Sequence, residues 1–548
     1  MRKTALVVLL AGFSIGQIHA QTMEDAFLLS ENNYEGTART IALGNAVTAL
    51  GGDLGAVTIN PAASAVATYS QVTLTPGISI VNTTTHGQSP FADGSRPFFQ
   101  NKMKTGQTDF FVPNFGFSVN LDTHRSRGVK KVAFGFTANV TNHWNEDTYA
   151  SGINETTSYL GAMAAAAKGY TPDELMSKNA FDFVPWNLAI GYYTGMIGHV
   201  GDNIYAGATE SVISKDTPDG QTVYDKQLAG PINQKFGRRI YGNKYDYTFN
   251  VGLNISDIVY VGANFGVTSA SYSYSQYINE SAVDPNDFKV EMEDDKGQIT
   301  VSYFEAMKYK SSYALKSSGI YGKIGIIITP VAGLRIGAAI QTPTINWITE
   351  NFEEAGESSF SGSGGGKYSE TSPLGENRYK LSSPFRGNVG IAYTFGKVGL
   401  LSADYEFCNY GSMKYTDAEY SGREELNAVN QDINTVYGTA HHFRVGAEVK
   451  PIPSFAIRAG YGFSTSADKW DFDKMPLPTL FRHDISFGLG YSTKGTFFID
   501  AAVKREIRED LTIKVYEDYI EDTVNFPSPS IRLKRAPWKA VLTLGWRF

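Results

Sequence analysis

Apolar and polar residues alternate along the last eleven positions of the chain. One set of alternate positions is apolar: Trp538, Ala540, Leu542, Leu544, Trp546 and Phe548. The other set is mainly polar: Lys539, Val541, Thr543, Gly545 and Arg547. Successive side chains of a β-strand point to opposite faces, so this pattern predicts a strand with an apolar outside and a polar inside.

The same alternation recurs in segments of about ten residues throughout the chain. The clearest lie at 443–450, 455–463, 485–491 and 497–504. Others lie at 71–82, 110–122, 130–142, 245–256, 258–275, 318–329, 333–348, 379–395 and 396–410. Together with the terminal strand they predict about fourteen antiparallel strands, an even number that suits a closed barrel. The stretch 143–243 leaves this count open, because two more strands there would make sixteen.

The connections between the predicted strands alternate in length. Short turns lie at 450–454 and 491–495, whereas long polar loops lie at 411–438, 466–480 and 509–534. Short turns at one end and long loops at the other are typical of outer-membrane barrels, with the short turns in the periplasm. The terminal Phe548 resembles the C-terminal signature of such barrels.

Composition supports a membrane barrel over a helical enzyme. Aromatic residues make up 13% of the chain, and it contains 55 glycines. After the first twenty residues no run of about eighteen apolar residues follows, so no membrane helix is expected. The net charge of −7 is spread along the chain and predicts neither nucleic acid nor anionic lipid as a partner.

Residues 1–20 read as a secretory signal peptide. Arg2 and Lys3 form the charged start, and the apolar core that follows is too short to span a bilayer. The expected cleavage site precedes Gln21. With the barrel pattern, this segment predicts the outer membrane of a Gram-negative bacterium as the location.

The inward positions of the C-terminal strands carry charges of both signs, which predicts ion pairs inside the barrel. The set comprises Asp404, Glu406, Arg444, Glu448, Arg458, Asp500, Lys504, Lys539 and Arg547. These side chains are expected to pair with one another or with a plug. The alternative is a selectivity path for polar solutes.

Residues 21–70 do not alternate like a membrane strand. They are rich in glycine and small residues, which let a chain fold tightly in a confined space. Residues 42–50 predict a short helix, and Asn60-Pro61 is a turn signal before the first strand. A compact segment ahead of a barrel predicts an N-terminal hatch that plugs the lumen.

The run from Gly36 to Ser64 resembles the hatch of the FadL-type long-chain fatty-acid transporters, in a branch found in Bacteroidetes-type bacteria. Asn60, Pro61 and Ala62 match that family's Asn-Pro-Ala hatch motif. Val112-Pro113-Asn114, followed by an alternating strand, is similar to the family's second strand. The fourteen-strand count and the terminal Phe548 agree with this resemblance.

The resemblance implies an all-β fold, namely a transmembrane antiparallel barrel at 71–548 with a hatch at 21–70 in its lumen. It implies passive transport of hydrophobic small molecules such as long-chain fatty acids. The hatch would move, and the solute would leave sideways through a kink in the third strand. Gly135 is the candidate kink, or else an ordinary barrel glycine. The expected partners are outer-membrane lipid, lipopolysaccharide and the barrel-assembly machinery, and the expected state is a monomer.

The long stretch 143–243 is interpreted as an outside cap, with helices at 162–167 and 172–178 and either a helix or a strand at 186–197. Its apolar side chains are candidates for a ligand groove, or alternatively for the packing of the cap. The candidates are Trp144, Tyr159, Leu160, Met163, Phe181, Phe183, Trp186 and Met196.

The sequence carries no pattern of an enzyme or of a bound cofactor. His441-His442 begins a strand, so the two rings face opposite sides and cannot share a metal. The acidic run 291–295 lacks the spacing of a calcium loop. Cys408 has no cysteine partner and is expected as a small buried side chain. A general porin or a surface-adhesion barrel remains the alternative function.

Overall fold

The structure is a computed structural model. It describes residues 22–88, 99, 101–201, 203–216, 222–293, 299–418, 423–469, 481–493, 496–508, 510–521 and 524–548. The predicted signal peptide, residues 1–20, lies outside this part of the chain. Among the described residues, no helix is both long enough and apolar enough to cross a membrane.

The strands close into an antiparallel barrel of 14 strands, which confirms the predicted count and excludes sixteen. Several wall strands consist of two pieces. In chain order the wall is β1 (Gln71–Gln88), β2 (Met103–Asp122), β3 (Val129–Asn154), β8 (Ile232–Ile255), β9 (Val259–Ala282), β11 (Ile299–Val331), β12 with β13 (Leu334–Gln341, Ile345–Gly362), β15 with β16 (Gly375–Ser382, Arg386–Phe395), β17 with β18 (Gly399–Asn409, Lys414–Ala418), β19 (Thr439–Ile452), β20 (Phe455–Ser464), β21 (Arg482–Thr493), β22 with β23 (Phe497–Arg508, Leu511–Lys514) and β26 (Ser530–Arg547). The pairing of β1 with β26 closes the ring.

The exterior of the wall is a continuous apolar band. In β26 the outward side chains from Trp538 to Trp546 are exposed, and the inward Lys539 and Thr543 are buried, as the alternation predicts. Exposed apolar side chains occur at the same level on the other strands: Leu74, Ile78, Phe117, Phe134, Phe249, Val251, Phe265, Ile324, Ile336, Ile391, Leu401, Val445, Ile457, Leu489 and Val503. An outward apolar band on a closed barrel is the surface that faces lipid, so the protein spans the outer membrane.

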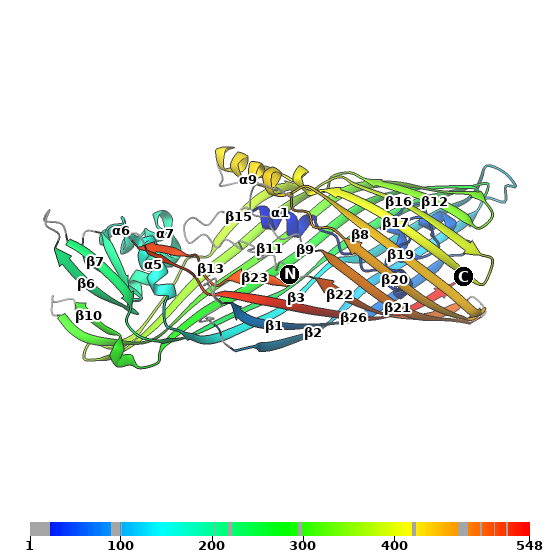
Figure 1. The fold of residues 1–548 in the computed structure, drawn as a ribbon. Coiled ribbons are helices and arrows are strands. Elements are labelled where there is room, and N and C mark those ends of the chain that lie inside the picture. The colour runs from blue at the N-terminus through cyan, green and yellow to red at the C-terminus, as the bar shows by residue number, and fades with distance from the viewer. Residues whose placement is uncertain are drawn as a thin grey trace.

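The short turns lie at one end of the barrel and the long connections at the other (Figure 1). The end with the short turns is the periplasmic end, and the opposite end faces the cell exterior. At the outer end the strands continue well beyond the predicted limits. For example, β3 and β8 stay paired to Asn154 and Ile232. The apolar alternation stops where the wall leaves the lipid, whereas the backbone ladder continues, so the pattern underestimates strand length.

Four short strands outside the cap extend the wall at its outer edge or form a hairpin in an outer loop. β10 (Lys289–Glu293) pairs with β11, and β14 (Gly366–Thr371) pairs with β13. β24 (Tyr519–Glu521) and β25 (Val524–Phe526) form a separate hairpin. A short 3-10 turn, η1 (Pro285–Asp287), precedes β10, and another, η2 (Tyr410–Ser412), joins β17 to β18.

The cap lies at the outer end and spans residues 155–231, between β3 and β8 (Figure 1). It contains four helices and two hairpins. They are α5 (Tyr159–Ala167), α6 (Pro172–Leu175), α7 (Ala180–Phe183), α8 (Trp186–Tyr193), β4 (Ile197–Gly201) with β5 (Ile204–Gly207), and β6 (Glu210–Asp216) with β7 (Thr222–Leu228). The helices predicted near 162–167 and 172–178 are confirmed, and the ambiguous segment at 186–197 is a helix over 186–193 that is followed by β4 from Ile197. A further helix, α9 (Arg423–Val436), lies in the loop between β18 and β19.

Residues 22–70, called the N-terminal segment here, lie inside the barrel (Figure 1). The segment contains α1 (Met23–Ser30), α2 (Ala38–Ala42), α3 (Leu54–Val57) and α4 (Ala63–Val66). The helix predicted at 42–50 is wrong, because α2 ends at Ala42. Gly44 and Asn45 follow with φ of 63° and 59°, and this left-handed backbone ends a helix.

Candidate functional site

The Asn60-Pro61-Ala62 motif joins the N-terminal segment to the barrel wall. Asn60 is fully buried, and its amide nitrogen donates to Thr48 O (2.7 Å) and to Ile326 O of β11 (3.2 Å). Its side-chain oxygen accepts from Ala62 N (3.0 Å). Pro61 O accepts from Asn250 Nδ2 of β8 (2.9 Å). The motif therefore bonds to its own segment and to two strands at once.

Glycines in the wall make room for this motif. A Cβ on Gly325 of β11 would collide with Asn60 Oδ1, and a Cβ on Gly262 of β9 would collide with the backbone of Pro61. Because glycine has no side chain, the segment approaches the strands at backbone distance. Lys323 reinforces the contact, since its Nζ donates to Thr58 O (2.7 Å).

Glu35 joins the N-terminal segment to the C-terminal strands by a buried ion pair. One carboxylate oxygen lies 3.3 Å from Lys504 Nζ and 2.5 Å from Lys539 Nζ. Burial alone would raise the pKa of Glu35, but the two ammonium groups outweigh it and hold that pKa below its usual range. The carboxylate is therefore charged at neutral pH and binds both lysines.

A second ion-pair chain runs from the segment into the wall. Arg39 Nε lies 3.0 Å from Glu448, which also binds Arg458 at 2.6 Å, and Arg458 binds Asp500 at 2.6 Å. This network and the one around Glu35 confirm that the inward charges pair with one another and with a plug. A separate group pairs Glu406 with Arg386 (3.0 Å) and with Arg444 (2.6 Å).

Aromatic side chains surround α1 in the outer half of the lumen. Phe27 of α1 packs at 4.9 Å from the Tyr410 ring and at 5.2 Å from the Tyr437 ring. The compartment also contains Leu29, Trp144, Tyr272, Tyr313, Leu315, Ile348, Tyr379, Cys408, Met413 and Tyr415. In this structure α1 occupies an apolar compartment whose walls come from at least six strands.

The backbone ladder between β2 and β3 ends partway along the wall. We call this gap in the ladder the opening. Their ladder runs from Asp122–Lys131 at the periplasmic end and stops at Asn114–Asn139. Pro113, the next residue of β2, has no N–H to donate to a ladder. In β3 the register with β8 shifts between Val140 and Asn142, which is a β-bulge. A bulge bends its strand, so β3 leaves the β2 ladder here and keeps its backbone ladder with β8. Further out, Thr105 of β2 and Thr85 of β1 donate side-chain hydrogen bonds to Asp147 O and Tyr149 O of β3.

The N-terminal segment takes the place of β2 at this bulge. Asn33 N donates to Thr141 O (2.6 Å), and Glu35 N donates to Val140 O (2.9 Å). Asn142 Nδ2 donates to Glu31 O (2.7 Å). At the bulge, the carbonyl groups of Val140 and Thr141 are therefore satisfied by the segment inside the barrel.

Side chains of both strands fill the opening. The Phe111 ring of β2 stacks on the His143 ring of β3 at 4.5 Å. His143 Nε2 lies 3.3 Å from Asp109 Oδ2, and its Nδ1 lies 2.6 Å from Asn243 Oδ1. Phe111 also belongs to a buried cluster with Ala38 and Ile41 of α2. We call Asp109, Phe111 and His143 the gate side chains.

Gly135, the predicted kink site, has a regular neighbourhood. It pairs in register with Ser118 of β2 and with Asn250 of β8. A Cβ at Gly135 would meet only ordinary contacts, the nearest at 3.4 Å. The irregularity in β3 lies about five residues further on, at Val140–Asn142.

The candidate groove residues divide into two places. Trp144 lies in the lumen, where its ring meets Tyr272 at 5.4 Å. Tyr159, Leu160, Met163 and Met196 are buried in the packed core of the cap. The other three candidates lie at its surface or edge: Phe181 packs edge-on against Trp186 at 6.2 Å, Trp186 contacts Phe352 at 5.0 Å, and Phe183 is 79% exposed. The structure does not bring these eight side chains together.

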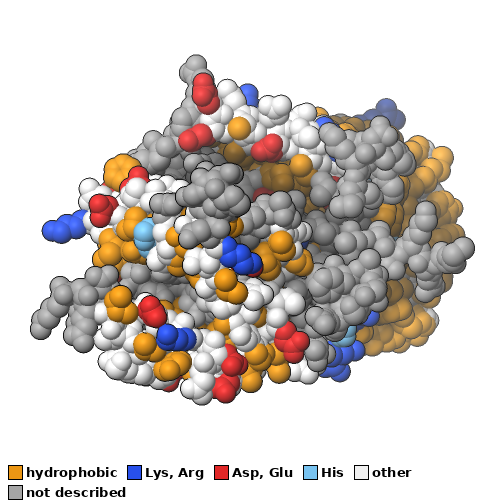
Figure 2. Space-filling view, turned by 60° about the vertical axis from the view of Figure 1, so that its left-hand side comes forward, with side chains coloured by type: hydrophobic (Ala, Val, Ile, Leu, Met, Phe, Trp, Pro, Cys, Tyr) orange, Lys and Arg blue, Asp and Glu red, His pale blue; other side chains and the backbone are white. Residues whose placement is uncertain are grey.

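The outer end of the molecule carries mixed polar, charged and apolar side chains, whereas the wall beside it is largely apolar (Figure 2). The sequence analysis did not identify His143, which lines the opening. Asn33, Glu35 and Phe111 were not identified, and their roles depend on contacts between residues that lie far apart in the chain. Pro113 was the one local signal of this place.

Other chemical candidates have structural roles. Cys408 is buried and unpaired in the aromatic compartment, as expected. His441 bonds Tyr405 (2.8 Å) and His442 bonds Ser464 (2.8 Å) on the opposite face. In the acidic run, Glu291 pairs with Lys289 at 3.2 Å, and residues 294–295 lie outside the described part.

Comparisons with solved structures place the chain in a known fold. A Pseudomonas aeruginosa FadL homologue aligns with 95% of this chain and 100% of its own at a TM-score of 0.52 and 12% identity. The toluene transporter TodX of Pseudomonas putida aligns with 95% of this chain and 100% of its own at 0.45 and 12%. The Ralstonia pickettii toluene transporter TbuX aligns with 94% and 99% at 0.42 and 14%. No protein-family model and no curated protein sequence matches the chain.

Proposed function

We propose that this barrel is a passive outer-membrane channel for hydrophobic small molecules such as long-chain fatty acids, with lateral release through the wall between β2 and β3. The chain has the FadL-type fold, on the strength of the Pseudomonas aeruginosa FadL homologue. One observation carries the proposal. The N-terminal segment hydrogen-bonds to β3 at Val140 and Thr141, where β3 has left β2.

Each part of the route has a physical reason. An apolar solute crosses the polar outer leaflet poorly, so a passage from the outer loops through the wall bypasses that layer. The aromatic compartment around α1 provides an apolar resting place at the outer end of the lumen. Displacement of Asn33–Glu35 from β3 would loosen the opening, and the gate side chains Phe111 and His143 would then separate to admit a solute to the membrane.

The alternative, a general porin, is less consistent with the lumen. The N-terminal segment packs against the wall so closely that the cavity beside Tyr34 and Arg444 measures about 20 Å³. The larger cavity near the periplasmic mouth, beside Arg39 and Tyr69, measures about 280 Å³. A steady path for polar solutes requires a connected aqueous lumen.

The experiment removes the bulge and leaves the rest of the wall intact. Deleting Thr141 brings Val140 and Asn142 into consecutive register with Tyr245 and Lys244. We expect β3 to straighten, the opening to close, and uptake of radiolabelled oleate to fall at least about tenfold. Uptake is measured in a host that lacks its own fatty-acid transporter, and heat-modifiable migration in gels checks folding.

The same strand pair offers a matched control. A second register shift lies between Val129 and Lys131, at the periplasmic end. Deleting Lys130 removes that irregularity far from the opening, and we expect wild-type uptake. Full uptake by a folded variant that lacks Thr141 would exclude release at this point of the wall.

A further inference from the structure

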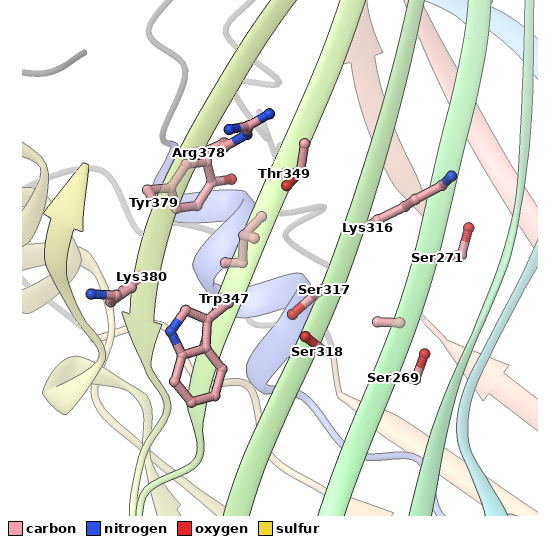
Figure 3. Close-up of a pocket in the computed structure, with 12 residues that line it drawn as sticks. Ser269, Ser271, Lys316, Ser317, Ser318, Trp347, Thr349, Arg378, Tyr379 and Lys380 are labelled. Carbon is pink, nitrogen blue, oxygen red and sulfur yellow. The ribbon is translucent and has the colours of Figure 1, made fainter. Parts of the chain in front are cut away.

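A hollow of about 680 Å³ lies on the outer surface of the wall, across β9, β11, β13 and β15 (Figure 3). It is lined by three consecutive residues of each strand, and the middle residue of each three is buried. The exposed members are Ser269, Ser271, Lys316, Ser318, Trp347 and Arg378, and Lys380 is half-buried. Exposed side chains on alternate positions of wall strands face away from the lumen, so this hollow faces the surroundings of the barrel.

The charged residues that line the hollow are all basic: Lys316, Arg378 and Lys380. Strand register brings them together from separate strands. Lys316 and Arg378 both pair with Thr349, from opposite sides, so two strand spacings, about 10 Å, separate their backbones. Lys380 is paired with Trp347. A chain with a net charge of −7 thus concentrates three cations around one hollow.

The position relative to the membrane decides what such a hollow binds. On β11 the outward residues Ile320, Ile324 and Ile326 are exposed in the apolar band, and Ser318 and Lys316 follow toward the cell exterior. Trp347 is 42% exposed at the same boundary, where tryptophan is enriched at membrane interfaces. The hollow therefore lies where the acyl chains of the outer leaflet end and its headgroups begin.

We infer that this hollow is a binding site for a phosphorylated glycolipid of the outer leaflet, the lipid A part of lipopolysaccharide. Guanidinium and ammonium groups bind phosphate by charge-assisted hydrogen bonds. The serine hydroxyls beside them offer hydrogen bonds to sugar hydroxyls. The exposed isoleucines below the hollow contact the acyl chains, as basic pockets above an apolar surface do for anionic lipids.

Two carboxylates lie near the three cations: Asp417 is the ladder partner of Lys380, and Glu376 lies close to Arg378. Arg378 Nη2 lies 2.6 Å from Glu376 Oε1, and both side chains are about half exposed. An exposed ion pair of this kind contributes little, so a phosphate group with two negative charges can share or replace it. The site is independent of the proposed transport route, because the gate side chains lie on β2 and β3.

The test compares two sets of charge reversals. The site variant is K316E/R378E/K380E, and the control is K102E/K104E/K235E, which reverses three exposed lysines before β2, on β2 and on β8. Each protein is purified from outer membranes in mild detergent, and bound lipid A is counted by native mass spectrometry. We expect the wild type and the control to retain lipid A, and the site variant to retain at least about tenfold less.

Rebinding separates the headgroup from other sources of retention. Delipidated wild-type protein is titrated with bisphosphorylated lipid A, with its dephosphorylated form and with inorganic phosphate. We expect preference for the bisphosphorylated lipid over the dephosphorylated one. Equal binding of both lipids, displacement by inorganic phosphate at equal concentration, or equal retention by the site variant would each overturn the assignment. If the reversals impair folding, K316Q/R378Q/K380Q is measured instead, with the same expected loss.

Discussion

At the scale of single residues, the contact between the N-terminal segment and the wall depends on glycines of the wall as much as on hydrogen-bonding side chains. Gly325 and Gly262 let Asn60 and Pro61 reach the backbone of β11 and β9. Asn60 then satisfies three polar groups in a place that water does not reach. Removing one partner of such buried groups costs about 1–3 kcal/mol each, so the motif is a firm attachment point.

Substituting Gly325 by valine tests this attachment. The new side chain would collide with Asn60, and we expect the N-terminal segment to be displaced, with trypsin cleavage within residues 22–70 at least about tenfold faster. Gly322→Val on the same strand is the control, because a Cβ there meets only Thr342 Cγ2 at 3.8 Å. Equal protease resistance of the two variants would show that the segment is not held at Asn60.

Much of this residue-scale detail has only weak sequence signals. Asn60-Pro61-Ala62 was identified from its likeness to a hatch motif, but its partners on β8 and β11 were not. Glu35 has no pattern around it that predicts Lys504 and Lys539 as partners. Such pairs form because the barrel closes and encloses the segment, and the distance along the chain carries no information about that.

At the scale of elements, α1 is the part of the N-terminal segment that occupies the aromatic compartment. Phe27 inserts between Tyr410 and Tyr437, and Leu29 is buried nearby. The helix is short and carries two acidic residues in its first turn, Glu24 and Asp25. Its place in the lumen is held by this packing and by hydrogen bonds that Lys244 and Arg386 donate to Leu29 O and Ser30 O. A solute of similar shape competes for the packing.

Truncating Phe27 to alanine should make room for such a solute. Dry apolar cavities of ring size bind benzene-like molecules, so we expect several-fold tighter binding of toluene, measured by calorimetry in detergent. Phe183→Ala is the control, because that ring is exposed on the cap and away from the lumen. An increase with Phe183→Ala instead would move the binding compartment to the cap.

The wall strands show where the alternation of apolar and polar residues stops predicting strand structure. The period-two alternation located every wall strand within the lipid, but not the outer extensions, where outward residues such as Lys308 and Lys310 are polar. Gly135 was the candidate kink of the third strand, with an ordinary barrel glycine as the alternative, and the irregularity of β3 lies at Val140–Asn142. Strand geometry there depends on Pro113 and on the segment that replaces β2, not on a glycine.

At the scale of the whole molecule, the N-terminal segment lies in the lumen and is attached to the wall on several sides. Ion pairs through Glu35 and Arg39, together with the bonds of Asn60, join it to strands on several sides of the lumen. Buried pairs of this kind contribute little net stability, but breaking them leaves uncompensated charges. Complete departure of the segment from the lumen is therefore disfavoured, because it would break all of these pairs.

Deleting residues 22–64 tests whether the N-terminal segment closes the lumen to ions. In planar bilayers we expect the intact protein to give no steady conductance and the deletion to open a channel that conducts ions freely. Deleting the β6–β7 hairpin, residues 210–228, is the control, because it shortens the cap and leaves the lumen filled. Steady conductance by the intact protein would contradict the closed lumen and favour a general porin.

The sequence by itself determined that the chain folds in a membrane and that it forms an antiparallel barrel. The side chains of a strand in a membrane wall alternate between lipid and lumen, and short turns join the strands at the periplasmic end. Both features therefore produce local sequence patterns. Only the tertiary structure decided how the inside is arranged. Which charges pair, where β3 leaves β2, and which cations gather on the outer wall all depend on register between distant strands, and register is fixed only when the barrel closes.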